Sequence, residues 1–264
     1  MKTTIRLGET TLERRGRPAW KELLPKEHGV WAWLVLPLVL ALCLAPTVST
    51  FAGALSVVSG FGAAQALGRA VRGSRLAAKP TMLALILANI FGFIAVANSP
   101  HPGVLVATLL GGGFVGFIGM LYLRGRPPRL AGFELLGIAG FLGLAIGLAL
   151  AGGALPGRVV AGAMALGAWL VLGLWWIKGS LAKVLSNRQP WPAGRWFSAV
   201  AVAASLALGV AVGHPAAGAL PLLYGLRVAL HRAPNHARDA KRLGLIELAW
   251  GTATALAAGL VSLL

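Results

Sequence analysis

The chain consists of long apolar stretches separated by short polar gaps. A transmembrane helix needs about 20 mostly apolar residues, and most of these stretches have close to that length. Backbone polar groups in lipid must be satisfied internally, which favours helices over open sheets. The pattern therefore predicts an all-α, polytopic membrane protein with nine transmembrane helices, near 28–46, 50–68, 81–98, 103–123, 131–151, 159–177, 196–212, 216–230 and 243–264.

Basic residues are confined almost entirely to alternate gaps. Of the 24 Lys and Arg residues, 23 lie near 1–27, 69–80, 124–130, 178–195 and 227–242, which carry 7, 4, 3, 4 and 5 of them. The intervening gaps carry one, Arg158. Because cytoplasmic loops of membrane proteins are enriched in Lys and Arg, we expect a cytoplasmic N-terminus and an outside C-terminus.

The composition supports a single membrane domain with only short loops and a short N-terminal arm outside it. Only 12% of the residues are charged, against about 25% in soluble proteins. We expect a cytoplasmic arm over 1–27 and a nine-helix domain over 28–264. The positive-inside pattern accounts for the net charge of +17, so membrane lipids, and not nucleic acid, are the expected partners. The single cysteine, Cys43, excludes an intrachain disulfide.

Three of the seven acidic residues, Glu27, Glu134 and Glu247, lie near cytoplasmic ends of predicted helices. A carboxylate there can stabilise its own helix dipole, or it can face a cavity or an ionic partner. His28 and Trp31 follow Glu27 and share a helix face. An imidazole at this place can hydrogen-bond a ligand or serve only the structure.

Other polar and aromatic residues suggest packing roles. The pairs Gly112/Gly116 and Gly143/Gly147 predict close helix packing, and Asn89 near mid-span predicts an interhelical hydrogen bond. HExxH, CxxC and P-loop motifs are absent from the sequence, so we expect no metal site and no cofactor. An aromatic belt at the membrane surface is expected from four residues, Trp175, Trp176, Trp191 and Trp196.

One segment carries a family resemblance. Residues 25–32, Pro-Lys-Glu-His-Gly-Val-Trp-Ala, precede an apolar helix that contains Pro37. This resembles the opening signature of the YwiC-like family of bacterial membrane proteins, with Val30 in place of the usual Ala. Segments 177–196 and 226–247 resemble the family more diffusely, and the former lacks its usual Glu. The resemblance implies the bacterial cytoplasmic (inner) membrane and no assigned reaction.

A more distant similarity in topology is to UbiA-type intramembrane prenyltransferases, which also have nine helices and a cytoplasmic N-terminus. That similarity implies a UbiA-like helical bundle. Those enzymes hold Mg²⁺ on Asp-rich motifs after helices two and six. Here the matching places carry Arg69, Arg72 and Lys178. Because Arg and Lys can bind an anion directly, we expect no metal at these positions.

These features favour a protein that binds an amphipathic anion, such as a prenyl phosphate, quinone precursor, porphyrin or lipid, in a cytoplasm-facing chamber. One alternative is a UbiA-like prenyltransferase with an atypical, metal-independent site. Another is a small-molecule transporter, which the absence of mid-span charge disfavours. The residues expected to bind the ligand are Glu27, His28, Trp31, Arg69, Arg72, Glu134, Lys178, Arg227, Lys241 and Glu247.

Overall fold

The computed structural model describes residues 28–70, 77–123, 131–186 and 237–261, with isolated residues between 203 and 223. The regular secondary structure in these ranges is helical, which confirms the all-α prediction for them. The helices are α1 (His28–Leu44), α2 (Val48–Ala70), α3 (Ala78–Ala97), α4 (Pro102–Leu123), α5 (Ala131–Ala151), α6 (Pro156–Ser186) and α9 (Ala237–Val261).

These seven helices correspond in order to predicted spans one to six and nine. The predicted spans near 196–212 and 216–230 fall almost entirely outside the described residues, so the count of nine stays a prediction. Three of the described helical segments are long and apolar enough to cross a membrane: α2, α3 and the Pro156–Leu174 part of α6. These segments indicate a membrane protein.

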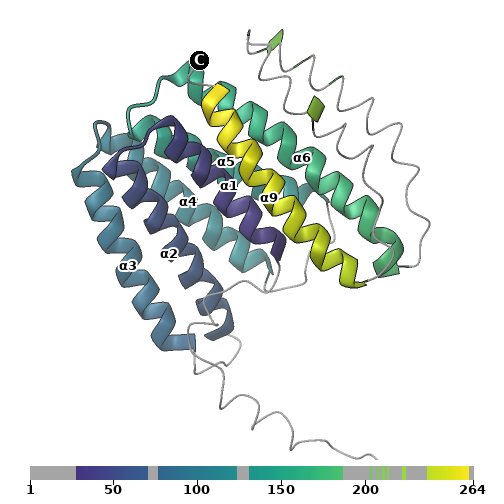
Figure 1. Ribbon diagram of the computed structural model, residues 1–264. Helices are drawn as coiled ribbons and strands as arrows, with labels where there is room; N and C mark the ends of the chain where they lie inside the picture. The colour runs from purple at the N-terminus through teal and green to yellow at the C-terminus, as the bar shows by residue number, and fades with distance from the viewer. Residues whose placement is uncertain are drawn as a thin grey trace, which may run out of the picture.

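Successive helices from α1 to α6 run up and down through the bundle (Figure 1). Their charge-poor turns meet at one end, where the Ser99 hydroxyl donates a hydrogen bond of 2.7 Å to the Ala151 carbonyl. Gly152, just after α5, packs against Thr50 at the beginning of α2. The helix ends near Arg69, Lys79, Lys178 and Lys241 lie at the other end. This arrangement agrees with the alternation of basic and charge-poor gaps.

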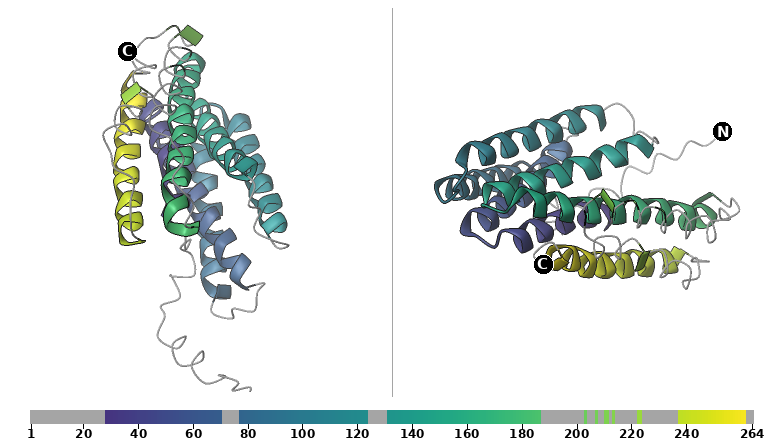
Figure 2. Two further views of the ribbon diagram at one scale, coloured as in Figure 1. Left: turned by 90° about the vertical axis from the view of Figure 1, so that its right-hand side faces the viewer. Right: turned by 90° about the horizontal axis from the view of Figure 1, so that it is seen from above.

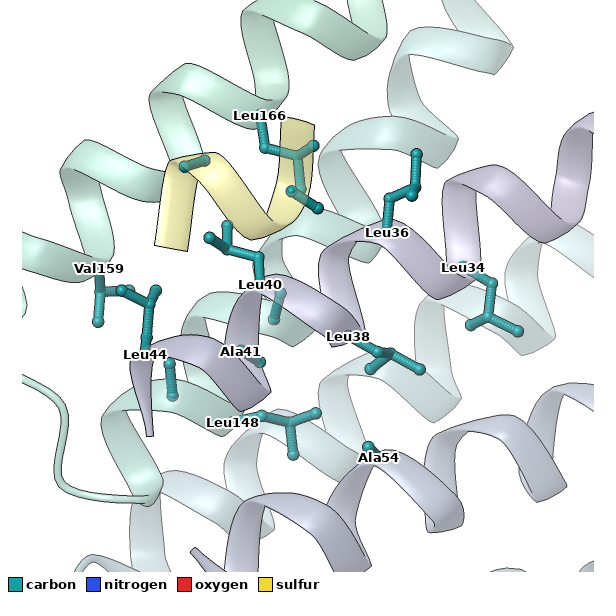
Figure 3. Close-up of a cluster of buried hydrophobic side chains, with 14 of the residues drawn as sticks. Leu34, Leu36, Leu38, Leu40, Ala41, Leu44, Ala54, Leu148, Val159 and Leu166 are labelled. Atoms are coloured by element: carbon teal, nitrogen blue, oxygen red, sulfur yellow. The ribbon is translucent and has the colours of Figure 1, made fainter. Parts of the chain in front are cut away.

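Helix α1 is the centre of the bundle. It packs against α2, α5, α6 and α9, and Leu34, Leu36, Leu38 and Leu40 are all buried although they point in different directions (Figure 3). A helix that is apolar on all sides is suited to such a position. Helix α9 contacts only α1 and α6 among the described helices, and it lies away from α3 and α4 (Figure 2).

Helices α2 and α3 form a pair held by serine hydroxyls. Ser49 donates to the Ala95 carbonyl at 3.0 Å, and Ser56 donates to the Ala88 carbonyl at 2.8 Å. In lipid, such interhelical bonds supplement van der Waals packing. Asn89 was predicted to form one, but its amide donates to the carbonyl of Leu85 in its own helix, at 2.8 Å. Within the described part of the chain that prediction is wrong, because Asn89 lies on the exposed face of α3.

Close helix packing at glycine is confirmed at two of the predicted positions. A β-carbon on Gly112 of α4 would collide with Leu144 of α5, and one on Gly147 of α5 would collide with Thr108 of α4. Gly143 was expected to share this role, but a β-carbon there would meet nothing within 4 Å. Gly112 of α4 and Gly147 of α5 therefore allow close packing at the α4–α5 interface, and the side-chain surroundings of Gly116 lie outside the described residues.

Helices α6 and α9 extend further than predicted at the basic end. Helix α6 continues to Ser186, nine residues past position 177, and α9 begins at Ala237, six residues before position 243. At 1.5 Å per residue these extensions add about 14 Å and about 9 Å of helix. The apolar pattern marks only the part of a helix that lies in lipid, so it underestimated the length of both helices. Lys178 and Lys241 consequently lie on helices.

Candidate functional site

Glu247 is buried in the membrane part of the bundle. It is 4% exposed and is the only buried charged residue among those whose side-chain burial is described. The apolar stretch predicted near 243–264 begins at Leu243, so Glu247 lies about 6 Å inside it. An ionisable group is costly to place there, and such groups face a bundle interior or a polar cavity. The structure thus rules out a Glu247 side chain that faces headgroups.

Helices α1 and α6 lie on the side of α9 that carries Glu247. Gly251, one turn further along α9, shares its face because residues four apart are neighbours on a helix. A β-carbon on Gly251 would come within 2.5 Å of Leu36 Cδ1 in α1 and 2.6 Å of Trp169 Cη2 in α6. The missing β-carbon lets the Trp169 indole lie against the α9 backbone. Glu247 is therefore directed toward α1 and α6.

Two indoles of α6 are buried beside this face. Trp169 is 4% exposed and Trp176 is 7% exposed, and a separation of seven residues places them on one side of the helix. From the Gly251–Trp169 contact, Glu247 lies about 6 Å toward the basic end and Trp176 about 10 Å in the same direction. The buried carboxyl thus lies at a depth between the two indoles.

Trp176 was predicted to belong to an aromatic belt at the membrane surface, and for this residue the prediction is wrong. Its indole belongs to the buried apolar core where α6 packs against α1, α5 and α9. Trp169 was not singled out from the sequence. The available signal was its seven-residue spacing from Trp176, which indicates one shared face.

Several predicted site residues lie at the basic end of the helices around α1. His28 is the first residue of α1 and Trp31 the fourth. Glu134 is the fourth residue of α5. Helix α1 packs against α5, α6 and α9, so the ends that carry these residues and Glu247 belong to one group of neighbouring helices. Two further predicted site residues lie on these helices, Lys178 on α6 and Lys241 on α9.

Arg69 lies apart from Glu247. It is the penultimate residue of α2 and is half-buried. Helix α2 packs against α1 and α5, whereas α2 and α9 make no contact in the described part of the chain. Helix α1 therefore lies between the two residues. The predictions for Glu27, Arg72 and Arg227 concern positions outside the described residues.

The described residues contain no group of three or more His, Cys, Asp and Glu side chains placed to hold a metal ion. The expectation of a metal-free and cofactor-free protein stays a prediction. The described geometry supplies a buried carboxyl, two indoles and basic helix ends. The basic helix ends can attract an anionic group through charge-assisted hydrogen bonds.

Residues 24–148 match the YwiC-like protein family. The match begins just before the 25–32 signature and continues into α5, and it confirms the resemblance over this segment. The YwiC-like segment supplies α1, the central helix, whereas Glu247 and both indoles lie beyond it. No curated protein and no solved structure matches the chain. The distant similarity to UbiA-type prenyltransferases therefore stays a prediction.

Proposed function

We propose that this protein of the bacterial cytoplasmic membrane binds an amphipathic anion in a chamber open to the cytoplasm. The burial of Glu247 carries the proposal, because ionisable residues within membrane helices mark functional sites more often than structural ones. The proposal includes nine helices in a UbiA-like bundle, with the N-terminus in the cytoplasm and the C-terminus outside. The charge pattern supports that orientation.

The apolar part of the ligand is proposed to lie near Trp169 and Trp176, between α6 and its neighbours. Buried aromatic rings offer large apolar contact areas. The anionic head is proposed to lie at the basic helix ends, near Lys178 and Lys241. Prenyl phosphates, quinone precursors, porphyrins and anionic lipids share this chemistry of an apolar body with one anionic end.

Glu247 is proposed to position the basic residues that bind the anion. A carboxylate next to an anionic ligand would repel it, so a direct contact is unfavourable. A carboxylate paired with Arg227, Lys241 or His28 instead fixes the direction in which the base presents its N–H donors. Charge-assisted hydrogen bonds of this kind can hold a phosphate or carboxylate without a metal ion.

Native mass spectrometry of the protein, purified in mild detergent, tests this proposal. We expect a co-purifying anionic lipid-like molecule, which added geranylgeranyl monophosphate displaces. Glu247→Gln should weaken its retention by at least about tenfold, the effect of losing one charge-assisted bond of about 1.5–3 kcal/mol. Thr254→Val is the matched control, because Thr254 is also buried on α9 but its hydroxyl donates to the Trp250 carbonyl within the same helix.

Three results would overturn the proposal. The first is a wild-type protein that retains no anionic amphipath and takes up none of the probe. The second is equal retention by Glu247→Gln and the wild type. The third is equal loss in Glu247→Gln and Thr254→Val, which would indicate a general packing defect. A prenylated product would instead support the prenyltransferase, and flux across sealed vesicles without a product would support the transporter.

A further inference from the structure

Helix α3 exposes a continuous apolar seam with one polar residue in its middle. Met82, Ile86, Asn89 and Phe93 follow one another at spacings of four, three and four residues, the a/d pattern of helices that pack side by side. Met82 is 66% exposed, Ile86 45% and Phe93 76%. The opposite face of α3, which includes Ala84 and Ala95, is buried. The seam is thus the outward face of a helix whose other face is occupied.

Asn89 lies near the middle of α3 on this seam. It is 11 residues past Ala78 and eight before Ala97, or about 16 Å and 12 Å from the two helix ends. One amide N–H bonds to the Leu85 carbonyl at 2.8 Å, which is the only hydrogen bond of this side chain in the described part of the chain. Asn89 is exposed, and its second N–H and its amide oxygen have no hydrogen-bond partner in the described part of the chain. Lipid tails offer no hydrogen-bond partner.

We propose that a second copy of this protein packs along the seam of Met82, Ile86, Asn89 and Phe93, with the two Asn89 amides hydrogen-bonded to each other. A primary amide carries both a donor and an acceptor, so two amides complement each other across a two-fold axis. Two copies with one membrane orientation are related by an axis along the membrane normal. Such an axis brings identical residues together at equal depth.

The position of Asn89 also sets the register of the proposed dimer. A single Asn in an apolar a/d seam fixes the register of paired helices, because any shift leaves both amides without partners. Lys79, the basic residue nearest the seam, is exposed and lies at the beginning of α3. Its long side chain can extend to headgroups and water. Charge repulsion between the two copies is therefore confined to the membrane surface.

Cysteine cross-linking in native membranes tests this arrangement, since Cys43→Ser removes the only cysteine of the chain. In that background, Ile86→Cys on the seam should form a disulfide-linked dimer on oxidation. Leu83→Cys is the matched control, because Leu83 is also exposed, at 57% against 45% for Ile86, but lies to one side of the seam. We expect at least about fivefold more cross-linked dimer from Ile86→Cys.

The role of Asn89 is tested by energy transfer between labelled copies in phosphatidylglycerol-containing vesicles, diluted with lipid. Asn89→Leu should raise the dissociation constant roughly 3- to 30-fold, the range that corresponds to one interhelical hydrogen bond. Asn98→Leu is the control, because Asn98 makes the same bond to its own helix, to Ile94 at 2.8 Å, but at the helix end. It should leave the dissociation constant unchanged.

The proposal is wrong if the wild type stays monomeric at every lipid ratio, or if Leu83→Cys cross-links as well as Ile86→Cys. It is equally wrong if Asn89→Leu and Asn98→Leu dimerise alike. Cross-linking of Ile86→Cys to a different membrane protein, with no self-linked species, would also overturn it. Because Asn89 faces lipid, Asn89→Leu should keep the wild-type circular dichroism spectrum, which separates a loss of dimer from a loss of fold.

Discussion

The contact between α1 and α9 predicts a sharp difference between two Gly→Ala substitutions. Gly259 of α9 lies against Cys43 of α1, and an added β-carbon would collide with the β-carbon of Cys43 and come within 3.3 Å of its Sγ. A β-carbon attached to a helix backbone cannot rotate away. Gly259→Ala therefore has to push the two helices apart. Gly113→Ala on α4 adds the same methyl group where nothing lies within 4 Å.

The size of the effect follows from two opposing contributions. Carbon atoms pack best at about 3.5–4.0 Å, so α1 and α9 must separate by roughly 1 Å, and overpacking of this kind costs about 1–3 kcal/mol. Replacement of a helical Gly by Ala contributes about 0.5–1 kcal/mol of stability. Because both variants share the Gly→Ala contribution, we expect Gly259→Ala to be about 1–3 kcal/mol less stable than Gly113→Ala, which should lose no unfolding free energy.

Unfolding in mixed micelles of mild detergent and increasing dodecyl sulfate, followed by circular dichroism, measures both variants. A second substitution identifies the contact: Cys43→Gly removes the opposing β-carbon, so it should restore part of the stability of Gly259→Ala. The double-mutant cycle should give a coupling energy of at least about 0.5 kcal/mol. Equal stability of Gly259→Ala and Gly113→Ala, or a coupling energy of zero, would refute the reasoning.

Three further predictions concern packing, topology and metal dependence. Ser56→Ala removes the 2.8 Å bond to the Ala88 carbonyl and should cost about 0.5–1.5 kcal/mol of unfolding free energy in the same micelle assay, since a typical buried hydrogen bond contributes that much; an unchanged stability contradicts it. EDTA should leave ligand retention unchanged, because the gaps after spans two and six, 69–80 and 178–195, carry basic residues and no carboxylate. A loss of retention that Mg²⁺ reverses would contradict this prediction. Reporter fusions should all report the cytoplasm when they are placed after Arg72, Gly125, Arg188 and Arg238. A fusion that reports the outside would contradict the predicted number of helices.

The positions of the helices could be read from the sequence because the bilayer acts as a solvent of fixed thickness. Each apolar stretch must be long enough to cross it, and the basic gaps mark one side. The seven described helices appear in the predicted order, and charge-poor turns such as Gly152 beside Thr50 meet at one end. The extensions of α6 and α9 past the apolar stretches escaped this reasoning, because helix outside the lipid needs no apolar run.

Which face of each helix is buried could not be read from the sequence. Lipid-facing and core-facing surfaces of membrane helices are both apolar, so hydrophobic periodicity does not separate them. Phe93 is exposed and Leu36 is fully buried, although both belong to predominantly apolar helices. Asn89 illustrates the consequence: its depth was predictable, but its direction away from α2 was decided by the serine-mediated pairing of α2 and α3.

The candidate site divides in the same way. Sequence alone predicted that Glu247, His28 and Glu134 lie near one membrane face, because their distance from the basic gaps sets their expected depth. Tertiary structure decided that the Glu247 side chain is buried, that Trp169 packs against Gly251 of α9, and that α1 separates Arg69 from Glu247. Depth is a property of one helix and its solvent, whereas neighbours depend on how all the helices pack around α1.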